Sequence, residues 1–120
     1  MAMQMASRDV QGVTILDLKG RLTLGDGTSM LREGVLACLN QSKMIVVNLT
    51  HVDYIDSAGL GELVGGYTSA VNRGAVIGLM GLNSRVHDLM RVTKLFSVFA
   101  VYSDDASAVT GMKAQAAEKA

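Results

Sequence analysis

Ile55-Asp56-Ser57-Ala58-Gly59-Leu60-Gly61-Glu62-Leu63 is the stretch that decides the fold of this chain. It follows an apolar run, Met44 to Leu49, which predicts a buried strand. It also opens a segment with helical spacing of apolar residues. Ser57 therefore stands at a strand-to-helix junction, where free N–H groups and the helix dipole favour a negative group. We expect this junction to be able to hold a phosphate on Ser57.

Strands and helices are expected to alternate along the rest of the chain. Strands are predicted at about 3–8, 12–19, 44–50, 75–80 and 98–102. Helices are predicted at about 28–40, 57–72 and 84–94, with a last one after Ser103 or Asp104 as its cap. Asp26 or Thr28 is expected to cap the first helix. The segment 20–27 is expected to be a loop.

This alternation predicts a single α/β domain over residues 1–120, with a mixed, mainly parallel β-sheet packed with about four α-helices. The unbroken apolar runs 44–49 and 75–80 predict neighbouring strands in the sheet centre, buried on both faces. The opening hairpin adds an antiparallel edge. The alanine-rich end, 114–120, is expected to fray.

Composition excludes several classes of partner and location. The 11 basic residues balance 11 acidic ones among 120, which gives no electrostatic reason to bind nucleic acid or an anionic membrane. Cys38 is the only cysteine, which rules out an internal disulfide and fits a reducing cytosol. The longest apolar stretch, about 75–82, is too short to span a bilayer. We therefore expect a cytoplasmic protein that does not insert into membranes.

The helix after Ser57 is expected to have two different faces. Helical spacing directs one set of side chains to the sheet: Leu60, Leu63, Val64, Tyr67 and Val71. The opposite face then carries Ala58, Glu62, Gly65, Gly66, Ser69 and Arg73. Glycine within a helix costs about 1 kcal/mol relative to alanine, so these glycines call for a reason. We interpret Gly65 and Gly66 as a flat surface for a partner, and leave Gly61 open between that role and a crowded core.

Ser57 itself has two interpretations. Serine is a favoured N-cap, which stabilises a helix by about 1 kcal/mol through a bond to a free N–H. Asp56 could be the cap instead, which would leave the Ser57 hydroxyl free. The sequence leaves both possibilities open.

Catalytic and cofactor motifs are broken or missing. Gly59-Leu60-Gly61 would need a third glycine where Val64 stands to form a dinucleotide fingerprint. There is no Gly-Lys-Ser or Gly-Lys-Thr phosphate loop and no Gly-x-Ser-x-Gly elbow at Ser57. His51 and His87 are isolated and build no zinc set with one cysteine. We therefore expect no catalytic site, no cofactor and no metal.

At Asp56-Ser57-Ala58-Gly59-Leu60-Gly61 the chain resembles the STAS domains, most closely the bacterial anti-sigma factor antagonists. The similarity covers nearly the whole chain. It extends to Leu18-Lys19-Gly20-Arg21-Leu22, to Val46-Val47-Asn48-Leu49 before the motif, and to two later segments, Leu82-Asn83-Ser84-Arg85-Val86 and Leu89-Met90-Arg91-Val92-Thr93-Lys94-Leu95-Phe96.

The resemblance implies a binding module switched by phosphorylation, not an enzyme. In that family the serine after the aspartate, here Ser57, is phosphorylated by an anti-sigma factor serine kinase with a histidine-kinase-like ATPase fold. The unphosphorylated antagonist sequesters this kinase and releases the sigma factor. The phosphorylated form cannot bind, and a metal-dependent serine phosphatase removes the phosphate and restores the binding form. Partner binding is accordingly expected at Asp56, Ser57, Ala58, Gly59, Gly61, Glu62, Gly65, Gly66 and Ser69.

Two departures from the family pattern keep alternatives open. Ala58 stands where many members have a second hydroxyl residue, and Asp-Ser-Ala-Gly-Leu also looks like STAS subunits of bacterial lipid-transport ATPases. A stress-signalling scaffold component is a further alternative. Thr23 stands where many antagonists carry an acidic residue, and the unusual Leu24-Gly25-Asp26-Gly27 follows it. The sequence therefore leaves open whether the family's weak nucleotide binding carries over to this chain.

Overall fold

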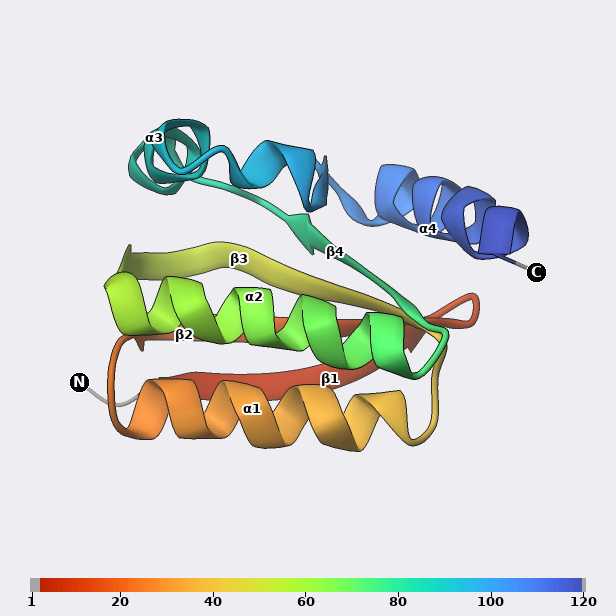
Figure 1. Cartoon of the computed structure of the whole chain (residues 1–120), viewed down its shortest axis with the longest axis horizontal. Helices are drawn as coiled ribbons and strands as arrows, with labels where there is room; N and C mark the ends of the chain where they lie inside the picture. Colours follow the sequence, from red (N-terminus) through yellow and green to blue (C-terminus); the bar gives the residue numbers. More distant parts are fainter. Residues whose placement is uncertain (1–2, 120) are drawn as a thin grey trace.

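A five-stranded mixed sheet forms the centre of the molecule in the computed structural model, which describes residues 3–119 (Figure 1). Its strands are β1 (Gln4–Val10), β2 (Val13–Leu22), β3 (Met44–Ile55), β4 (Val76–Met80) and β5 (Ala100–Tyr102), and they lie in that order. β1 pairs antiparallel with β2, and all other pairs are parallel. The predicted mixed, mainly parallel sheet is confirmed, with β3 at its centre beside β4.

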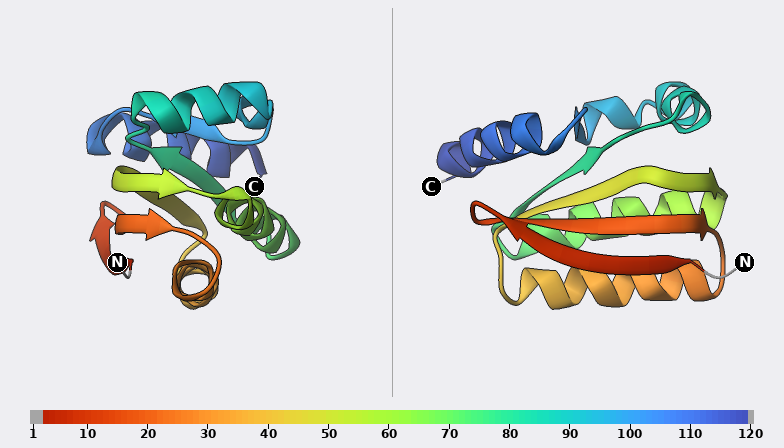
Figure 2. Two further views of the ribbon diagram at one scale, coloured as in Figure 1. Left: turned by 90° about the vertical axis from the view of Figure 1, so that its left-hand side faces the viewer. Right: turned by 180° about the vertical axis from the view of Figure 1, so that it is seen from behind.

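Four α-helices pack against this sheet, as expected. They are α1 (Asp26–Leu39), α2 (Ser57–Asn72), α3 (Ser84–Val92) and α4 (Asp105–Lys119), with a short 3-10 turn, η1 (Leu95–Ser97), after α3. α1 and α2 lie side by side on one face, and α4 lies on the other (Figures 1 and 2). Across residues 3–119, none of the helices is both long and apolar enough to cross a membrane.

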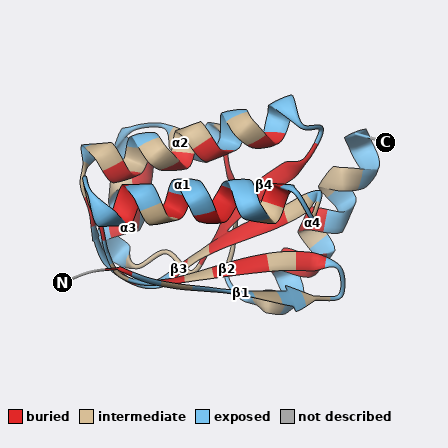
Figure 3. Ribbon diagram, turned by 90° about the horizontal axis from the view of Figure 1, so that it is seen from below, coloured by how far each residue is buried: buried red, intermediate tan, exposed pale blue. Residues whose placement is uncertain are grey.

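Two apolar layers result, one on each face of the sheet. Neighbouring residues of β3 alternate between them: Ile45 and Val47 pack in the larger layer beneath α1 and α2, and Val46 packs beneath α4. β4 divides in the same way, with Ile77 on one side and Val76 on the other. Seen from the helical side, the buried residues of α1 and α2 form stripes that face the sheet (Figure 3). The two apolar runs, of which the first is interrupted by Asn48, therefore mark strands buried on both faces.

The sequence predicted a loop over 20–27, but only residues 23–25 lie between β2 and α1. β2 continues to Leu22 because Leu22 pairs with Ile55 of β3. α1 then begins at Asp26 with Gly25 as its N-cap, so neither Asp26 nor Thr28 is the cap. The Thr28 hydroxyl instead accepts a hydrogen bond from the Gly25 N–H at 3.2 Å.

The C-terminal segment is helical to Lys119, and residue 120 lies outside the described residues, so the fraying of 114–120 stays a prediction. Asp104 precedes α4 and accepts the Ser107 N–H at 2.8 Å, as a cap does. Ala116 packs against the apolar layer under α4, and the Lys119 ammonium donates to the Ala75 carbonyl at 3.5 Å. These contacts hold the last turns in place.

The buried face of α2 is rotated relative to the prediction. Leu63 is buried as expected, but Tyr67 and Val71 are 36% and 43% exposed. The other buried positions are Gly59, Gly66 and Ala70. Small residues let the helix axis approach the sheet closely, and the larger apolar side chains are displaced to its flanks. The prediction failed because it considered only the hydrophobicity of the residues, and so placed the large apolar side chains of α2 against the sheet.

Gly66 is therefore buried and not on the outer face, so its predicted placement is wrong; its part in partner binding stays a prediction. A Cβ built there would lie 3.6 Å from Ile77 Cδ1 and 3.7 Å from Val35 Cγ1. These are ordinary packing distances, so the position sits between α1, α2 and β4 with room for a methyl group and little more.

Substitutions at Gly66 should show this packing. Gly66→Ala should keep the free energy of unfolding within about 1 kcal/mol of wild type, since helix propensity improves and a methyl fits. Gly66→Lys should lower it by about 1–3 kcal/mol, because a long charged side chain overfills the junction. Gly61→Ala is the control, since Gly61 is exposed with nothing within 4 Å of its Cβ position. Urea unfolding of the three variants measures this, and a Gly66→Lys variant as stable as Gly61→Ala would contradict it.

Arg8 joins the edge of the sheet to the start of α4. Its guanidinium donates to Asp17 Oδ2 on β2 at 2.7 Å and to Asp105 Oδ2 on α4 at 2.6 Å. Burial alone would raise the pKa of Asp17, but hydrogen bonds from Arg8 and Asn48 outweigh it and lower that pKa. The pKa of Asp105 is also lowered, chiefly by the hydrogen bond from Arg8.

Arg8→Gln should lower the free energy of unfolding at pH 7 by about 0.5–1 kcal/mol, a small value because all three side chains are partly exposed. Carboxyl groups with a lowered folded pKa stabilise the fold above their ordinary value of 3.8 and lose that contribution as the pH falls through the folded value. The difference between the variant and wild type should therefore shrink as the pH falls below 3.8 and through the lowered folded pKa values.

Urea unfolding at several pH values measures this difference. Arg91→Gln is the control, since its exposed i,i+3 pair with Asp88 spans 3.5 Å. If the difference in free energy of unfolding between Arg8→Gln and wild type stays constant down to pH 2, Arg8 acts through packing and not through its ion pairs.

A candidate phosphorylation and docking site at the start of helix α2

The candidate site lies where β3 ends and α2 begins. Asp56 has an extended backbone and is the N-cap: the Gly59 N–H donates to its Oδ1 at 2.8 Å. Ser57 follows as the first helical residue, and its side chain is exposed. Of the two capping interpretations, the structure supports Asp56. The Ser57 side chain is left facing solvent at a helix N-terminus, where backbone N–H groups favour an anion.

Asp56 also binds the loop between β2 and α1. Its second oxygen, Oδ2, accepts the Leu24 N–H at 3.0 Å, and its own N–H donates to the Leu22 carbonyl at 3.3 Å. Hydrogen bonds from the N–H groups of Leu24 and then Gly59 lower the pKa of the Asp56 carboxyl. At neutral pH a carboxylate therefore joins three segments beside Ser57.

Gly59 is buried at this junction, and its part in partner binding stays a prediction. A Cβ there would collide with the Leu22 carbonyl oxygen, and it would lie 3.0 Å from Leu22 Cγ and 3.1 Å from Ile55 Cγ2. Only a residue without a side chain allows the first turn of α2 to lie directly on the ends of β2 and β3. The glycine of the Asp-Ser-Ala-Gly-Leu motif thus serves the fold and sets the position of Ser57.

The remaining predicted contact residues follow the outward side of α2. Ser57 and Gly61 are exposed, and four more are half-buried: Ala58, Glu62, Gly65 and Ser69. Glu62 is 12% exposed because Arg32 of α1 covers it, with Nη2 to Oε1 at 2.8 Å. The two helices border a shallow groove lined by Leu31, Arg32, Leu36, Glu62, Gly65 and Ser69. Glu62 is therefore held by an ion pair across this groove.

Leu24 is a surface feature of the site that the sequence did not single out. Its side chain is 78% exposed, more than that of any other large apolar residue among those that the structure describes. It stands on the loop that Asp56 holds. The unusual sequence of that loop was the available signal, but nothing local indicates that the side chain points outward.

The two histidines are exposed on other elements than α2. His51 is exposed on β3, four residues before the strand ends, which is roughly 13 Å along the strand. His87 is exposed on α3, with its ring 5.0 Å from that of Phe96. Within residues 3–119 no three His, Cys, Asp or Glu side chains are arranged to hold a metal.

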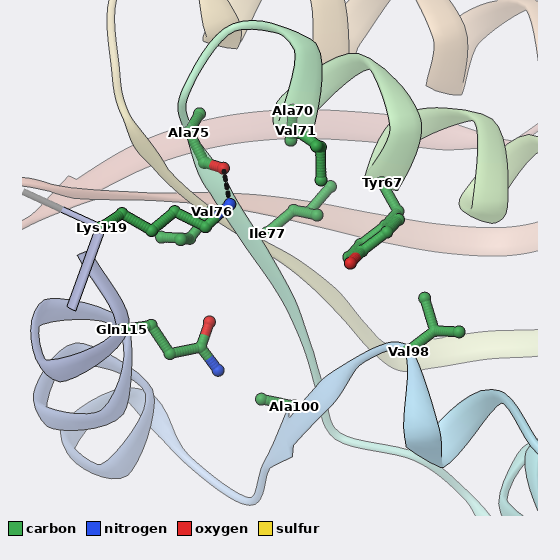
Figure 4. A pocket seen from close by; sticks show the side chains of 10 residues that line it. All are labelled: Tyr67, Ala70, Val71, Ala75, Val76, Ile77, Val98, Ala100, Gln115 and Lys119. Carbon is green, nitrogen blue, oxygen red and sulfur yellow. Dashed lines mark hydrogen bonds between the residues drawn. The ribbon is translucent and has the colours of Figure 1, made fainter.

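A hollow of about 140 Å³ lies at the far end of α2, between its last turns, β4 and α4 (Figure 4). Tyr67 and Val71 border it on one side, and Gln115 and Lys119 on the other. Lys119 already bonds the Ala75 carbonyl there. The hollow is separate from the candidate site.

Comparisons with known proteins agree on one family. The sequence profile of the STAS domain matches residues 4–108. The anti-sigma F factor antagonist of Paenibacillus polymyxa is 27% identical over 115 residues, which cover 94% of this chain and 97% of that protein.

Solved structures share the fold. An anti-sigma factor antagonist from Mycobacterium paratuberculosis matches with a TM-score of 0.80 at 19% identity, over 93% of this chain and 95% of that one. The phosphorylated form of the Bacillus cell fate determinant SpoIIAA matches with a TM-score of 0.68 at 15% identity, over 91% and 97%. At such identities the likeness concerns the fold alone.

Gly59→Ala should lower the free energy of unfolding by about 2 kcal/mol or more, because a methyl group cannot share space with the Leu22 carbonyl without moving backbone. Gly61→Ala, two residues along the same helix, should be neutral or slightly stabilising. Asp56→Ala should also destabilise the protein, through loss of both N–H partners. Thermal unfolding of the three variants measures this, and equal melting of Gly59→Ala and Gly61→Ala would disprove the close approach.

Proposed function

The chain belongs to the STAS domain family, and from that premise we propose that it is an anti-sigma factor antagonist whose binding is switched at Ser57. Unphosphorylated, it sequesters an anti-sigma factor kinase and so releases the sigma factor. Phosphorylated, it cannot bind. The observation that carries this proposal is the geometry at Ser57: an exposed hydroxyl at the start of α2, beside an aspartate that already caps the helix.

Two relatives support the assignment. The Paenibacillus polymyxa protein, similar along nearly the whole of both chains, is an anti-sigma F factor antagonist. SpoIIAA, which shares the fold, has been solved in a phosphorylated form. The proposed partners are a serine kinase with a histidine-kinase-like ATPase fold and a metal-dependent serine phosphatase.

Ser57 is suited to accept a phosphoryl group. In the transfer, the Ser57 hydroxyl oxygen bonds to the γ-phosphorus of ATP, ADP leaves, and the hydroxyl proton passes to a base on the kinase. Reacting atoms must come within about 3–3.5 Å, which an exposed side chain on the first turn of a helix permits. Because Asp56 provides the cap, reaction at Ser57 does not remove a bond that begins α2.

The phosphate should change the surface and leave the core in place. It adds about −1.5 to −2 charge and three acceptor oxygens. The start of α2 favours that charge by about 0.3–1 kcal/mol, and repulsion from the adjacent Asp56 opposes it. A partner that covers Ser57 would have to strip water from the phosphate and bury it unpaired. The charge therefore blocks association without unfolding the protein.

Ser57→Asp should keep the circular dichroism spectrum of wild type and lose binding to the cognate kinase. Ser57→Ala should bind the kinase and take no phosphate, because Ala58 leaves no second hydroxyl in the motif. Intact mass after incubation with kinase and ATP, followed by peptide mapping, tests modification, and calorimetric titration tests binding. Thr68→Ala is the control, since this exposed hydroxyl lies three turns along α2.

Two outcomes would contradict the switch. One is binding by both Ser57→Asp and the authentic phosphoprotein as tightly as by wild type. The other is a phosphate mapped to a residue other than Ser57. Either would favour a constitutive STAS subunit of a lipid-transport ATPase, or a scaffold component, in which Ser57 contacts a partner without modification.

A further inference from the structure

We propose that Leu24 is the apolar anchor by which this protein docks on its kinase, and that Asp56 holds it beside Ser57. The inference rests on the proposed function and adds a recognition residue on a different segment of the chain. Its occupant is a kinase surface that has an apolar recess next to the phosphoryl-donating nucleotide.

The first argument is that the Leu24 side chain is exposed while its backbone is fixed by a hydrogen bond. Its side chain is 78% exposed, while its N–H donates to Asp56 Oδ2 at 3.0 Å. The residues around it are fixed by further bonds: the Thr28 N–H donates to the Thr23 carbonyl at 3.2 Å, and the Gly25 N–H to Thr28 Oγ1 at 3.2 Å. An apolar side chain on a fixed backbone loses little entropy when a partner covers it, which suits a binding anchor.

The second argument is continuity with Ser57. Asp56 is the neighbour of Ser57 in the chain and the hydrogen-bond partner of Leu24. The loop before α1 and the start of α2 lie at the same edge of the molecule, at the ends of β2 and β3 (Figure 1). To transfer phosphate, the kinase must bring its nucleotide within about 3–3.5 Å of the Ser57 oxygen. A protein surface placed there also covers the Leu24 loop.

The third argument concerns the surface around Leu24. Fixing so exposed a leucine on an ordered loop has no value for the fold, because the side chain buries almost nothing. Polar groups lie near it: Asp26, two residues along the chain, is exposed, and Asp56, which accepts the Leu24 N–H, precedes the exposed Ser57. An apolar side chain with a polar rim is the arrangement of a binding hot spot.

Calorimetric titration tests the anchor. The probes are the histidine-kinase-like anti-sigma factors of the same genome, each loaded with ADP. Leu24→Ser should weaken binding by about 10- to 100-fold, the factor expected from losing one buried leucine. Val71→Ser is the matched control: Val71 is 43% exposed at the other end of α2, roughly 21 Å from Ser57 along the helix. It should bind within twofold of wild type.

A second measurement separates docking from placement of the serine. Under steady-state conditions with ATP, Leu24→Ser should raise the KM for phosphorylation by the same factor and leave kcat within about twofold, since the anchor binds and does not react. Thermal unfolding should match wild type because the side chain is exposed. A fall in kcat at unchanged KM would overturn the anchor and show that Leu24 acts on the position of Ser57.

The remaining outcomes distinguish this proposal from the proposed function. If Leu24→Ser binds as tightly as wild type while Ser57→Asp does not bind, the anchor is wrong and the switch stands. If neither variant loses binding, the switch is wrong and the anchor falls with it. If wild type self-associates in sedimentation and Leu24→Ser does not, Leu24 serves a second copy of this chain, and the kinase anchor is overturned.

Discussion

The carboxylate of Asp56 accepts one backbone N–H from α2 and one from the loop before α1, at 2.8 and 3.0 Å. This pair of bonds works only because α2 starts directly against the ends of β2 and β3, which Gly59 permits. One short side chain thus begins a helix, fixes a loop and sets the exposure of the serine that follows. The exposure of Ser57 and the position of Leu24 both depend on that junction.

The difference between the two faces of α2 follows from this close contact with the ends of β2 and β3. Its buried side uses Gly59, Leu63, Gly66 and Ala70, which allow a close approach to the sheet. Its outward side can then be small and polar without loss of core, because the sheet beneath is already packed by α1 and by the larger side chains of β3 and β4. Gly59 of the motif and Gly66, which suggested a docking surface, therefore both serve the packing of the helix on the sheet.

Phosphorylation of Ser57 would act by changing the surface of the protein, and it would not require a conformational change. Ser57 lies outside both apolar layers, and the bonds that begin α2 are made by its neighbour. A charge added there alters what can be placed against the protein and not how the protein is packed. The proposed regulation needs only the cost of burying an unpaired dianion, which exceeds most single contacts in an interface.

The sequence by itself determined the order of the elements, the two central strands and the place of Ser57 at a strand-to-helix junction. These features are local, since a run of apolar residues or a motif of six residues contains the information. Only the tertiary structure decided which side of α2 is buried, because that depends on side-chain size against Leu22, Val35 and Ile77, far away in the sequence. It also decided that Arg32 covers Glu62 and that Asp56 holds Leu24 exposed. Both contacts join segments about thirty residues apart, and no local pattern records which groups will meet.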